Sequence, residues 1–376
     1  MKIVAIKERA KGEDRVAITP ETAKLFVQNN YTVIVEKNIG ITANFTDSDY
    51  VSAGASVSAV PLEILSDADI ILKVQPTPCV DEFNEIEMAK EGSVIIGMLA
   101  PYTNSEYIDK SLSKKLSTIS MELLPRITKA QNMDVLSSQS NLAGYRAVIE
   151  AAYYFDRAFP MMMTSAGTIN PAKALVLGVG VAGLQAIATA KRLGCIVFAY
   201  DVREATKEQV ESLGAKFVYP KSATTEDAED KSGYAKEVAA DFAKLQKKFL
   251  SEIIADFDIV ITTAQIFGKK APVILTKEMI SKMKAGSVVV DIAASSGGNV
   301  EDSIADKVIS KKGVKIIGWT NMSSKIANDS SKLYAKNLYN FVNYAVKEDK
   351  FDFKDDLVEE VLIAAEGRIV NKKFLV

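Results

Sequence analysis

Three glycines, Gly178, Gly180 and Gly183, lie between the apolar segment 173–177 and a predicted helix at 184–193. In this G-x-G-x-x-G spacing, the first glycine permits a tight turn and the second lets the backbone approach a pyrophosphate. The third lets the helix pack closely on the strand, and the amides at the start of the helix face the phosphates. We therefore expect a dinucleotide to bind here, and the expected contacts include the intervening residues Val179, Val181 and Ala182.

Asp201 ends the next predicted strand, 196–200. A carboxylate about 20 residues after the glycines accepts hydrogen bonds from ribose hydroxyls and repels a 2′-phosphate, which favours NAD(H) over NADP(H). Arg203 leaves an alternative open, because a nearby arginine can serve a 2′-phosphate. A glycine-rich turn without a ligand is the other alternative. The expected cofactor contacts are completed by Val202, Arg203, Ala264 and Gln265.

The 376 residues include no histidine. Histidine is the usual general acid or base near neutral pH, so reactions that move no substrate proton gain weight. The 46 basic and 48 acidic side chains nearly balance, so no large net field favours nucleic acid as a partner. Cys79 and Cys195 lack metal-ligand spacing, which predicts no metal site and free thiols in a reducing, cytoplasmic compartment.

Two runs of short apolar strands alternate with helical stretches. The expected strands are 3–6, 33–35, 70–74, 94–99 and 117–121 in the first run, and 173–177, 196–200, 216–219, 258–262, 287–291 and 314–317 in the second. This order predicts the α/β class, with two doubly wound Rossmann-like parallel-sheet domains.

Helices are expected at 21–28, 82–90, 141–157 and 331–346. The helix at 141–157 would join the two lobes, and the one at 331–346 would return and pack on the first lobe. The predicted domains are therefore 1–136 plus 325–376, and an NAD(H)-binding domain at 137–324. No segment reaches the ~18 uninterrupted apolar residues of a spanning helix, so we expect no direct membrane insertion.

Three segments, 125–139, 178–193 and 291–299, resemble the NAD(H)-binding component, domain I, of proton-translocating nicotinamide nucleotide transhydrogenase. The resemblance extends over essentially the whole chain. Alanine dehydrogenase is similar through the early segment 15–20 and through Lys73.

In the transhydrogenase family, the loop that matches Arg126, Gln131, Asp134 and Ser137 holds the nicotinamide end of the nucleotide. A carboxamide has donor and acceptor atoms that Gln131 and Ser137 can satisfy, while Arg126 and Asp134 can orient each other and the ring. The resemblance thus implies that these four residues are catalytic. An ordinary ion pair of Arg126 with Asp134 at an interdomain seam is the alternative.

The family also has a mobile loop that closes over the nucleotide, and the polar stretch 220–233 matches it. Tyr234 follows this stretch and would be the closing aromatic residue of the catalytic set. Composition alone favours a plain solvated loop.

Two departures distinguish the chain from alanine dehydrogenase. The segment 97–101 lacks the histidine that the resemblance places near pyruvate, and 294–298 lacks an aspartate. Reductive amination must move protons, whereas hydride transfer between two nicotinamides moves none. Arg15 and Lys73 are then expected to be inherited scaffold or surface charges.

The resemblance implies a subunit that transfers hydride from NADH to NADP⁺, with NAD(H) on this chain and NADP(H) on a partner. It also implies a homodimer, docked on the cytoplasmic side of membrane-spanning subunits that couple the reaction to proton translocation. The resemblance therefore implies that the chain is cytoplasmic and peripheral to the cytoplasmic membrane, to which the partner subunits attach it. The alternatives are a soluble, alanine-type amino-acid dehydrogenase and an NAD-sensing module without catalysis.

Overall fold

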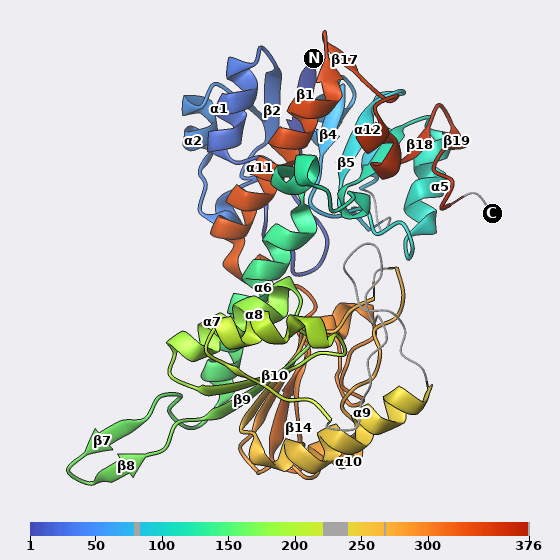
Figure 1. The fold of residues 1–376 in the computed structure, drawn as a ribbon. Coiled ribbons are helices and arrows are strands. Elements are labelled where there is room, and N and C mark those ends of the chain that lie inside the picture. The colour runs from blue at the N-terminus through green and yellow to red at the C-terminus, as the bar shows by residue number, and fades with distance from the viewer. Residues whose placement is uncertain (79–82, 221–239, 267, 375–376) are drawn as a thin grey trace. The chain divides into compact units, whose positions relative to one another are not determined.

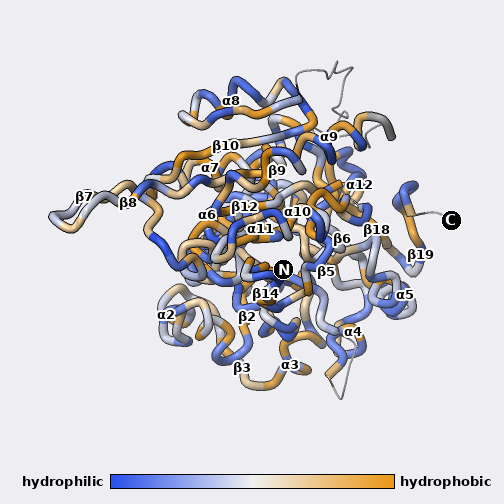
Figure 2. Tube along the Cα trace, turned by 90° about the horizontal axis from the view of Figure 1, so that it is seen from below, coloured by the Kyte–Doolittle hydropathy of each residue, from blue (hydrophilic) through white to orange (hydrophobic). Residues whose placement is uncertain are grey.

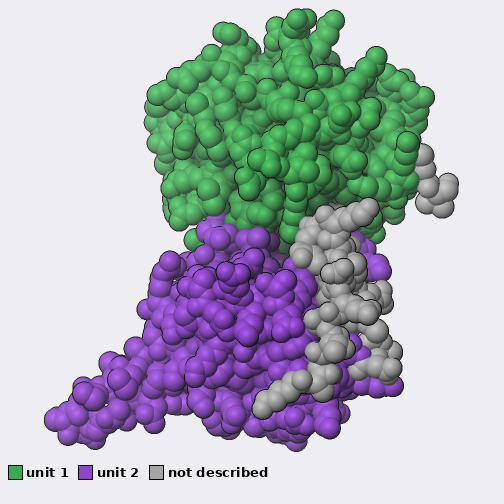
Figure 3. All heavy atoms as spheres, in the orientation of Figure 1, with its two compact units in different colours: residues 1–139, 324–376 green, residues 140–323 purple. Residues whose placement is uncertain are grey.

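The computed structural model describes residues 1–78, 83–220, 240–266 and 268–374. It divides the chain into two compact units, unit 1 with residues 1–139 and 324–376 and unit 2 with residues 140–323. Figure 3 colours the two units separately. The domains expected from the sequence, 1–136 plus 325–376 and 137–324, stay a prediction, since a compact unit need not fold alone.

Unit 1 contains a mixed sheet whose order, among the described residues, is β19-β18-β6-β5-β4-β1-β2-β3. The strands are β1 (Lys2–Ala5), β2 (Thr32–Glu36), β3 (Ser56–Ser58), β4 (Ile70–Leu72), β5 (Val94–Gly97), β6 (Ser117–Ser120), β18 (Leu362–Ala365) and β19 (Arg368–Ile369). Strands β1 to β6 pair in parallel, while β18 and β19 pair antiparallel. The sequence analysis does not predict β3, β18 and β19. Strands β3 and β19, with three and two residues, are too short to show a clear alternation.

The helices of unit 1 begin with local signals that the sequence carries. Thr19 caps α1 by accepting a hydrogen bond from Thr22 N, and Pro20 occupies the first turn, where its missing N–H has no partner to lose. The helices are α1 (Pro20–Gln28), α2 (Asp47–Ser52), α3 (Pro61–Leu65), α4 (Glu85–Met88), α5 (Ser105–Ser113), α11 (Ala327–Ala345) and α12 (Asp356–Val361). Helix α4 is shorter than the expected 82–90 because Asn84 caps it, accepting from Ile86 N and Glu87 N.

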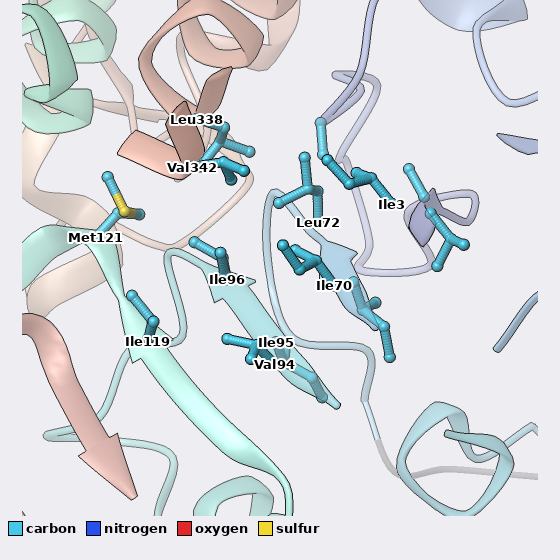
Figure 4. Close-up of a cluster of buried hydrophobic side chains, with 14 of the residues drawn as sticks. Ile3, Ile70, Leu72, Val94, Ile95, Ile96, Ile119, Met121, Leu338 and Val342 are labelled. Atoms are coloured by element: carbon cyan, nitrogen blue, oxygen red, sulfur yellow. The ribbon is translucent and has the colours of Figure 1, made fainter. Parts of the chain in front are cut away.

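Helix α11 packs in the hydrophobic core of unit 1. Its residues Leu338 and Val342 are fully buried in the same core as the strands. Figure 4 shows these side chains beside Ile96 and Met121. The short strands β16 (Val346–Lys347) and β17 (Lys350–Phe351) follow the helix as a hairpin.

Unit 2 contains a second sheet, with the order β11-β10-β9-β12-β13-β15-β14 among the described residues. Its strands are β9 (Lys173–Leu177), β10 (Ile196–Tyr200), β11 (Lys216–Phe217), β12 (Ile259–Thr262), β13 (Val288–Asp291), β14 (Val308–Lys311) and β15 (Val314–Ile317). All pair in parallel except the edge strand β14, which is antiparallel to β15. In Figure 2, β9 and β10 are mainly orange, hence apolar, as expected where helices cover both faces.

Helices cover both faces of this second sheet. Ala174 and Val176 of β9 pack in one buried cluster with α6 and α7, while Leu175 and Leu177 pack in another with α9 and α10. The helices are α6 (Val135–Tyr154), α7 (Val181–Arg192), α8 (Lys207–Ser212), α9 (Ala240–Ile253) and α10 (Lys277–Ile280). Two such clusters confirm the doubly wound arrangement that the sequence predicts.

Several features of unit 2 differ from the expectation. The antiparallel edge strand β14 is not among the expected strands. Helix α6 begins at Val135, earlier than the expected 141. A hairpin of β7 (Met162–Thr164) and β8 (Gly167–Ile169) follows it, projects from the body of unit 2 in Figure 1, and was not predicted. Both faces of this hairpin are exposed, so its sequence lacks the apolar and polar alternation of a half-buried strand.

Candidate nucleotide-binding site

The glycine segment connects β9 to α7 at the carboxyl end of the parallel sheet. Leu177 pairs with Tyr200 of β10, and Gly178 N donates a hydrogen bond to Tyr200 O at 2.9 Å. Gly180 caps α7, which begins at Val181 rather than at the expected residue 184. The strand, turn, helix and second strand therefore have the arrangement that a dinucleotide fingerprint requires.

The three glycines differ in what an added side chain would meet. Gly178 has φ +96°, and a Cβ there would lie 2.7 Å from Thr263 Oγ1. A Cβ on Gly183 would lie 2.0 Å from Gly178 O, whereas one on Gly180 would meet no atom within 4 Å. The first and third glycines are thus needed by the fold, while the second leaves open space beside the start of α7.

Asp201 lies directly after β10, next to the glycine turn. Its carboxylate is 5% exposed and accepts a hydrogen bond from Val179 N at 2.6 Å. Arg203 pairs with it through Nε at 3.0 Å, and Val202 O accepts from Tyr219 Oη at 3.4 Å. The structure thus brings Asp201, Arg203 and the turn residue Val179 together.

The loop after β12 lies against the same turn. Thr263 Oγ1 donates to Gly178 O at 2.9 Å, and a Cβ on Gly178 would come within 3.0 Å of Ala264 N. Ala264 is half-buried, and Gln265 beside it is exposed. Ala264 is therefore close to the glycine turn, as a cofactor contact must be.

Asp291 and Asn299 organise this loop, and neither was predicted as a site residue from the sequence. The buried Asp291 carboxylate accepts from Thr262 Oγ1 and Ala293 N at 3.1 Å. It also accepts from Asn299 N at 3.1 Å. Asn299, also fully buried, donates from Nδ2 to Ala264 O and Pro272 O at 2.8 Å. The signal was available, since an acid at the end of a buried strand is a polar group that must be satisfied.

The four residues expected to hold the nicotinamide belong to unit 1. Arg126 and Gln131 are exposed and flank or lie within a short 3-10 helix, Thr128–Met133. Asp134 Oδ1 accepts from Ser137 N at 2.9 Å and Asp134 Oδ2 accepts from Ser137 Oγ at 2.6 Å. The pair caps the first turn of α6, which is a structural role in its own right.

Three features named in the sequence analysis lie partly or wholly outside the described residues. Tyr234 lies outside them, as does the polar stretch after Pro220. Cys79 also lies outside them, whereas Cys195 is a buried free thiol. Burial, together with the nearby Asp258 carboxylate, raises the pKa of Cys195 to about 12, so this thiol is not a nucleophile near neutral pH.

Lys73 is a buried cation that acidic side chains of the chain itself neutralise. Its Nζ lies 3.0 Å from Glu85 Oε2 and 3.5 Å from Glu8 Oε2. Burial opposes its charge, but these carboxylates outweigh burial and hold the pKa of Lys73 above its usual value. Arg15 is likewise buried, with Nη2 2.6 Å from Glu13 Oε2 and Nη1 2.7 Å from Gln139 Oε1. This geometry favours a scaffold role for both cations.

Comparison with known families decides among the dinucleotide-binding proteins. Residues 4–143 match the N-terminal domain of alanine dehydrogenase/PNT, and residues 147–372 match its C-terminal domain. The chain belongs to the alanine dehydrogenase/PNT family. Two matches thus cover nearly all of the chain.

Within this family the chain is similar to transhydrogenase components, which are oxidoreductases. It is 61% identical to the first part of NAD(P) transhydrogenase subunit alpha from Rickettsia prowazekii, over 99% of this chain and 96% of that protein. It is 49% identical to the protein of the same name from Rhodospirillum rubrum, over 99% and 98%.

Solved structures agree with this assignment. The structure of transhydrogenase from Sinorhizobium meliloti matches with a TM-score of 0.88 and 44% identity, covering 98% of this chain and 100% of that one. An L-alanine dehydrogenase, at 22% identity, shares the fold with a TM-score of 0.83, over 99% and 98%. Among the described residues, no helix combines the length and apolar character needed to cross a membrane.

Proposed function

We propose that this chain binds NAD(H) and transfers hydride from NADH to NADP⁺ held by a partner subunit. A membrane-spanning partner would couple that transfer to proton translocation. The observation that carries the proposal is the open space at Gly180 beside Asp201, in a chain similar to transhydrogenase components and without a histidine.

The residues of unit 2 fit a dinucleotide. The space at Gly180 allows a pyrophosphate to approach the backbone, and the first amides of α7 offer donors to it. Asp201 offers a carboxylate to ribose hydroxyls, which supports NAD(H) over NADP(H). Val179, Val181, Ala182 and Gly183 complete the turn, while Val202, Ala264 and Gln265 are the further proposed contacts.

When bound, a reduced nicotinamide nucleotide supplies the hydride, so the protein must orient the ring and exclude water. We assign orientation to Arg126, Gln131, Asp134 and Ser137, and closure to Tyr234, which lies outside the described residues. Asp134 already accepts two hydrogen bonds from Ser137. That pairing fixes the first turn of α6, from which Ser137 projects.

The charges of unit 1 argue against amino-acid dehydrogenation. Lys73 and Arg15 are each neutralised by carboxylates of the chain itself, so neither is available to a substrate carboxylate without breaking a buried pair. The chain also has no histidine to move a proton. Hydride transfer between two nicotinamides needs neither group.

The partners follow from the names of the relatives, which describe only the first portion of an alpha subunit and hence one piece of a larger enzyme. We infer an NADP(H)-binding partner and membrane-spanning subunits, with this chain attached to them at the cytoplasmic side. A homodimer is the proposed state of the chain itself. Its exposed hairpin, 161–170, carries Met161, Met162, Met163 and Ile169 with 42–77% exposure, and such apolar surface suits a protein contact.

The decisive experiment mixes the purified chain with the NADP(H)-binding component and follows hydride exchange between NADH and an oxidised NADP analogue by absorbance. We expect exchange that requires both proteins. A parallel assay with pyruvate, ammonia and NADH should show no oxidation by the chain alone. Turnover in that assay would establish the amino-acid dehydrogenase instead, and NADH binding without exchange would favour the sensing module.

A further inference from the structure

Neighbouring donors of the chain itself occupy the acceptor positions of the Asp201 carboxylate. Its Oδ1 accepts from Arg203 N at 2.9 Å and from Arg203 Nε at 3.0 Å. Its Oδ2 accepts from Val179 N at 2.6 Å and from Arg203 Nη2 at 3.1 Å. A carboxylate has about four acceptor positions, so the described residues already occupy the capacity that ribose hydroxyls would need.

Only two of these four donors can leave without disturbing the fold. Val179 N belongs to the glycine turn, and Arg203 N belongs to the backbone directly after β10. The other two donors are on the Arg203 guanidinium, whose side chain is 13% exposed. Its Nη2 also donates to Val179 O at 3.3 Å, so the guanidinium bridges the end of β10 to the glycine turn.

We propose that the Arg203 guanidinium is a latch on Asp201, which a nucleotide must open before its ribose can bind. The inference rests on the proposed NAD(H) site. A closed latch lowers the fraction of molecules that are competent to bind, and the apparent affinity falls by that fraction. Opening makes Asp201 available to a ribose diol and separates it from the guanidinium, a group of the kind that pairs with phosphate.

The latch makes Arg203 a specificity-determining residue with two opposite effects. Its guanidinium competes with the ribose of NAD(H) for Asp201, so it weakens the binding of the preferred nucleotide. Asp201 in turn keeps the guanidinium paired and repels a 2′-phosphate, so it prevents Arg203 from recruiting NADP(H). Selectivity therefore depends on the pair rather than on the carboxylate alone.

NADH fluorescence titration of the full chain tests the first effect. In R203M, we expect NADH to bind about three- to tenfold more tightly, because the competitor is gone. R203K keeps the charge but loses the two-pronged donor geometry, so it should bind NADH at least as tightly as the wild type. Weaker binding in both variants would mean that Arg203 contacts the nucleotide, and it would overturn the latch.

Three comparisons make this result interpretable. R368M removes an exposed arginine of unit 1 and should leave NADH affinity unchanged. Thermal unfolding shows whether R203M is folded, and R203K serves as the test if it is not. If the wild type does not bind NADH at all, the proposed NAD(H) site is wrong. If the wild type binds NADH but R203M and R203K bind it more weakly, only the latch is wrong.

Titration with NADPH tests the second effect. D201N removes the repelling charge and weakens the hold on Arg203, so NADPH affinity should rise. The double variant D201N/R203M should lose that gain, because the phosphate then lacks its guanidinium. Equal NADPH binding by D201N and the double variant would overturn the role assigned to Arg203 in NADPH binding.

Discussion

In unit 2, the side-chain amide of Asn299 binds both backbone polar atoms of Ala264. Oδ1 accepts from Ala264 N at 3.0 Å, and Nδ2 donates to Ala264 O at 2.8 Å. Both residues follow strands of the same sheet, β13 and β12, so this amide ties two loops together at the carboxyl edge. Ala264 adjoins the glycine turn, and Asn299 is thus a positioning residue for the proposed nucleotide site.

Replacing Asn299 by alanine should loosen the loop that carries Ala264 and Gln265. It leaves the amide and carbonyl of Ala264 without their partner, and an unsatisfied polar group costs about 1–3 kcal/mol where it is buried. We expect a lower free energy of unfolding by urea and weaker NADH binding. N343A is the matched control at an exposed position of α11. It removes only an exposed hydrogen bond from Asn29 Nδ2, so it should lower the free energy of unfolding less than N299A does and leave NADH binding unchanged. An unchanged unfolding midpoint in N299A would contradict the positioning role of Asn299.

The glycine turn permits a comparison within one motif. G183A places a Cβ 2.0 Å from Gly178 O, whereas G180A places one in open space. The overpacked variant should lose about 1–3 kcal/mol of stability or more. G180A should unfold like the wild type, because φ −87° at Gly180 is allowed to alanine, yet it should bind NADH about tenfold more weakly, since its methyl group occupies the phosphate approach. If G180A binds NADH as tightly as the wild type, the phosphates of the nucleotide do not lie against this turn.

The sequence could predict the parts of the site that are contiguous in the chain. The motif from Gly178 to Asp201 combines a buried strand, a turn and a helix, and each depends on local residues. The hydrogen bonds between the Asn299 side chain and the Ala264 backbone depend on two strands becoming neighbours in the sheet. No local sequence pattern encodes that pairing. The hairpin at 162–169 escaped prediction because it is exposed on both faces and so shows no periodicity.

Asp134 and Ser137 illustrate a different limit. The family resemblance implies a catalytic role for both residues, and the sequence pattern places the helix start at 141. The structure instead begins α6 at Val135, which puts Asp134 directly before its first turn. Their hydrogen bonds identify a helix cap. Residue types alone do not separate a cap from a binding group, because both uses need the same acceptor.

Variants of that pair can separate the two roles. S137A keeps the backbone N–H that donates to Asp134 Oδ1, so the cap persists and stability should fall by no more than about 0.5 kcal/mol. If Ser137 also binds the nicotinamide, the rate of hydride exchange with the NADP analogue should fall while the melting temperature stays nearly constant. S113A, at an exposed serine of α5, is the control. If the rate of hydride exchange falls only in proportion to the melting temperature, Asp134 and Ser137 serve as a helix cap and do not bind the nicotinamide.

The buried cluster of Glu8, Lys73 and Glu85 predicts a pH dependence of stability. Burial raises the pKa of Glu8 to about 7 from 4.5, against the opposing effect of Lys73. The folded protein then binds more protons than the unfolded chain between about pH 4.5 and about pH 7, so this residue makes stability fall as the pH rises through that range. Above about pH 7 the loss is complete and its contribution is constant.

The variant E8Q isolates this contribution, because glutamine keeps the shape and cannot ionise. As the pH rises from about 4.5 to about 7, the free energy of unfolding of the wild type should fall relative to that of E8Q. The expected fall is on the order of 1–3 kcal/mol. E106Q, at an exposed glutamate of α5, is the control and should parallel the wild type. Glu85 has its pKa lowered, since Lys73, Thr77 and Tyr107 outweigh its burial, so its own contribution is lost only at lower pH. A wild-type curve parallel to that of E8Q would refute the assignment.

The hairpin of β7 and β8 gives the last prediction. Two strands alone are marginally stable in water, and Met163 in the middle of β7 is 77% exposed. We expect this hairpin to be ordered by a second copy of the chain, so M163D should shift sedimentation from dimer toward monomer by placing a charge in an apolar contact. L62D introduces the same charge at an apolar residue of unit 1 with 55% exposure and should leave the dimer intact. Dissociation by L62D alone would place the contact on unit 1 instead.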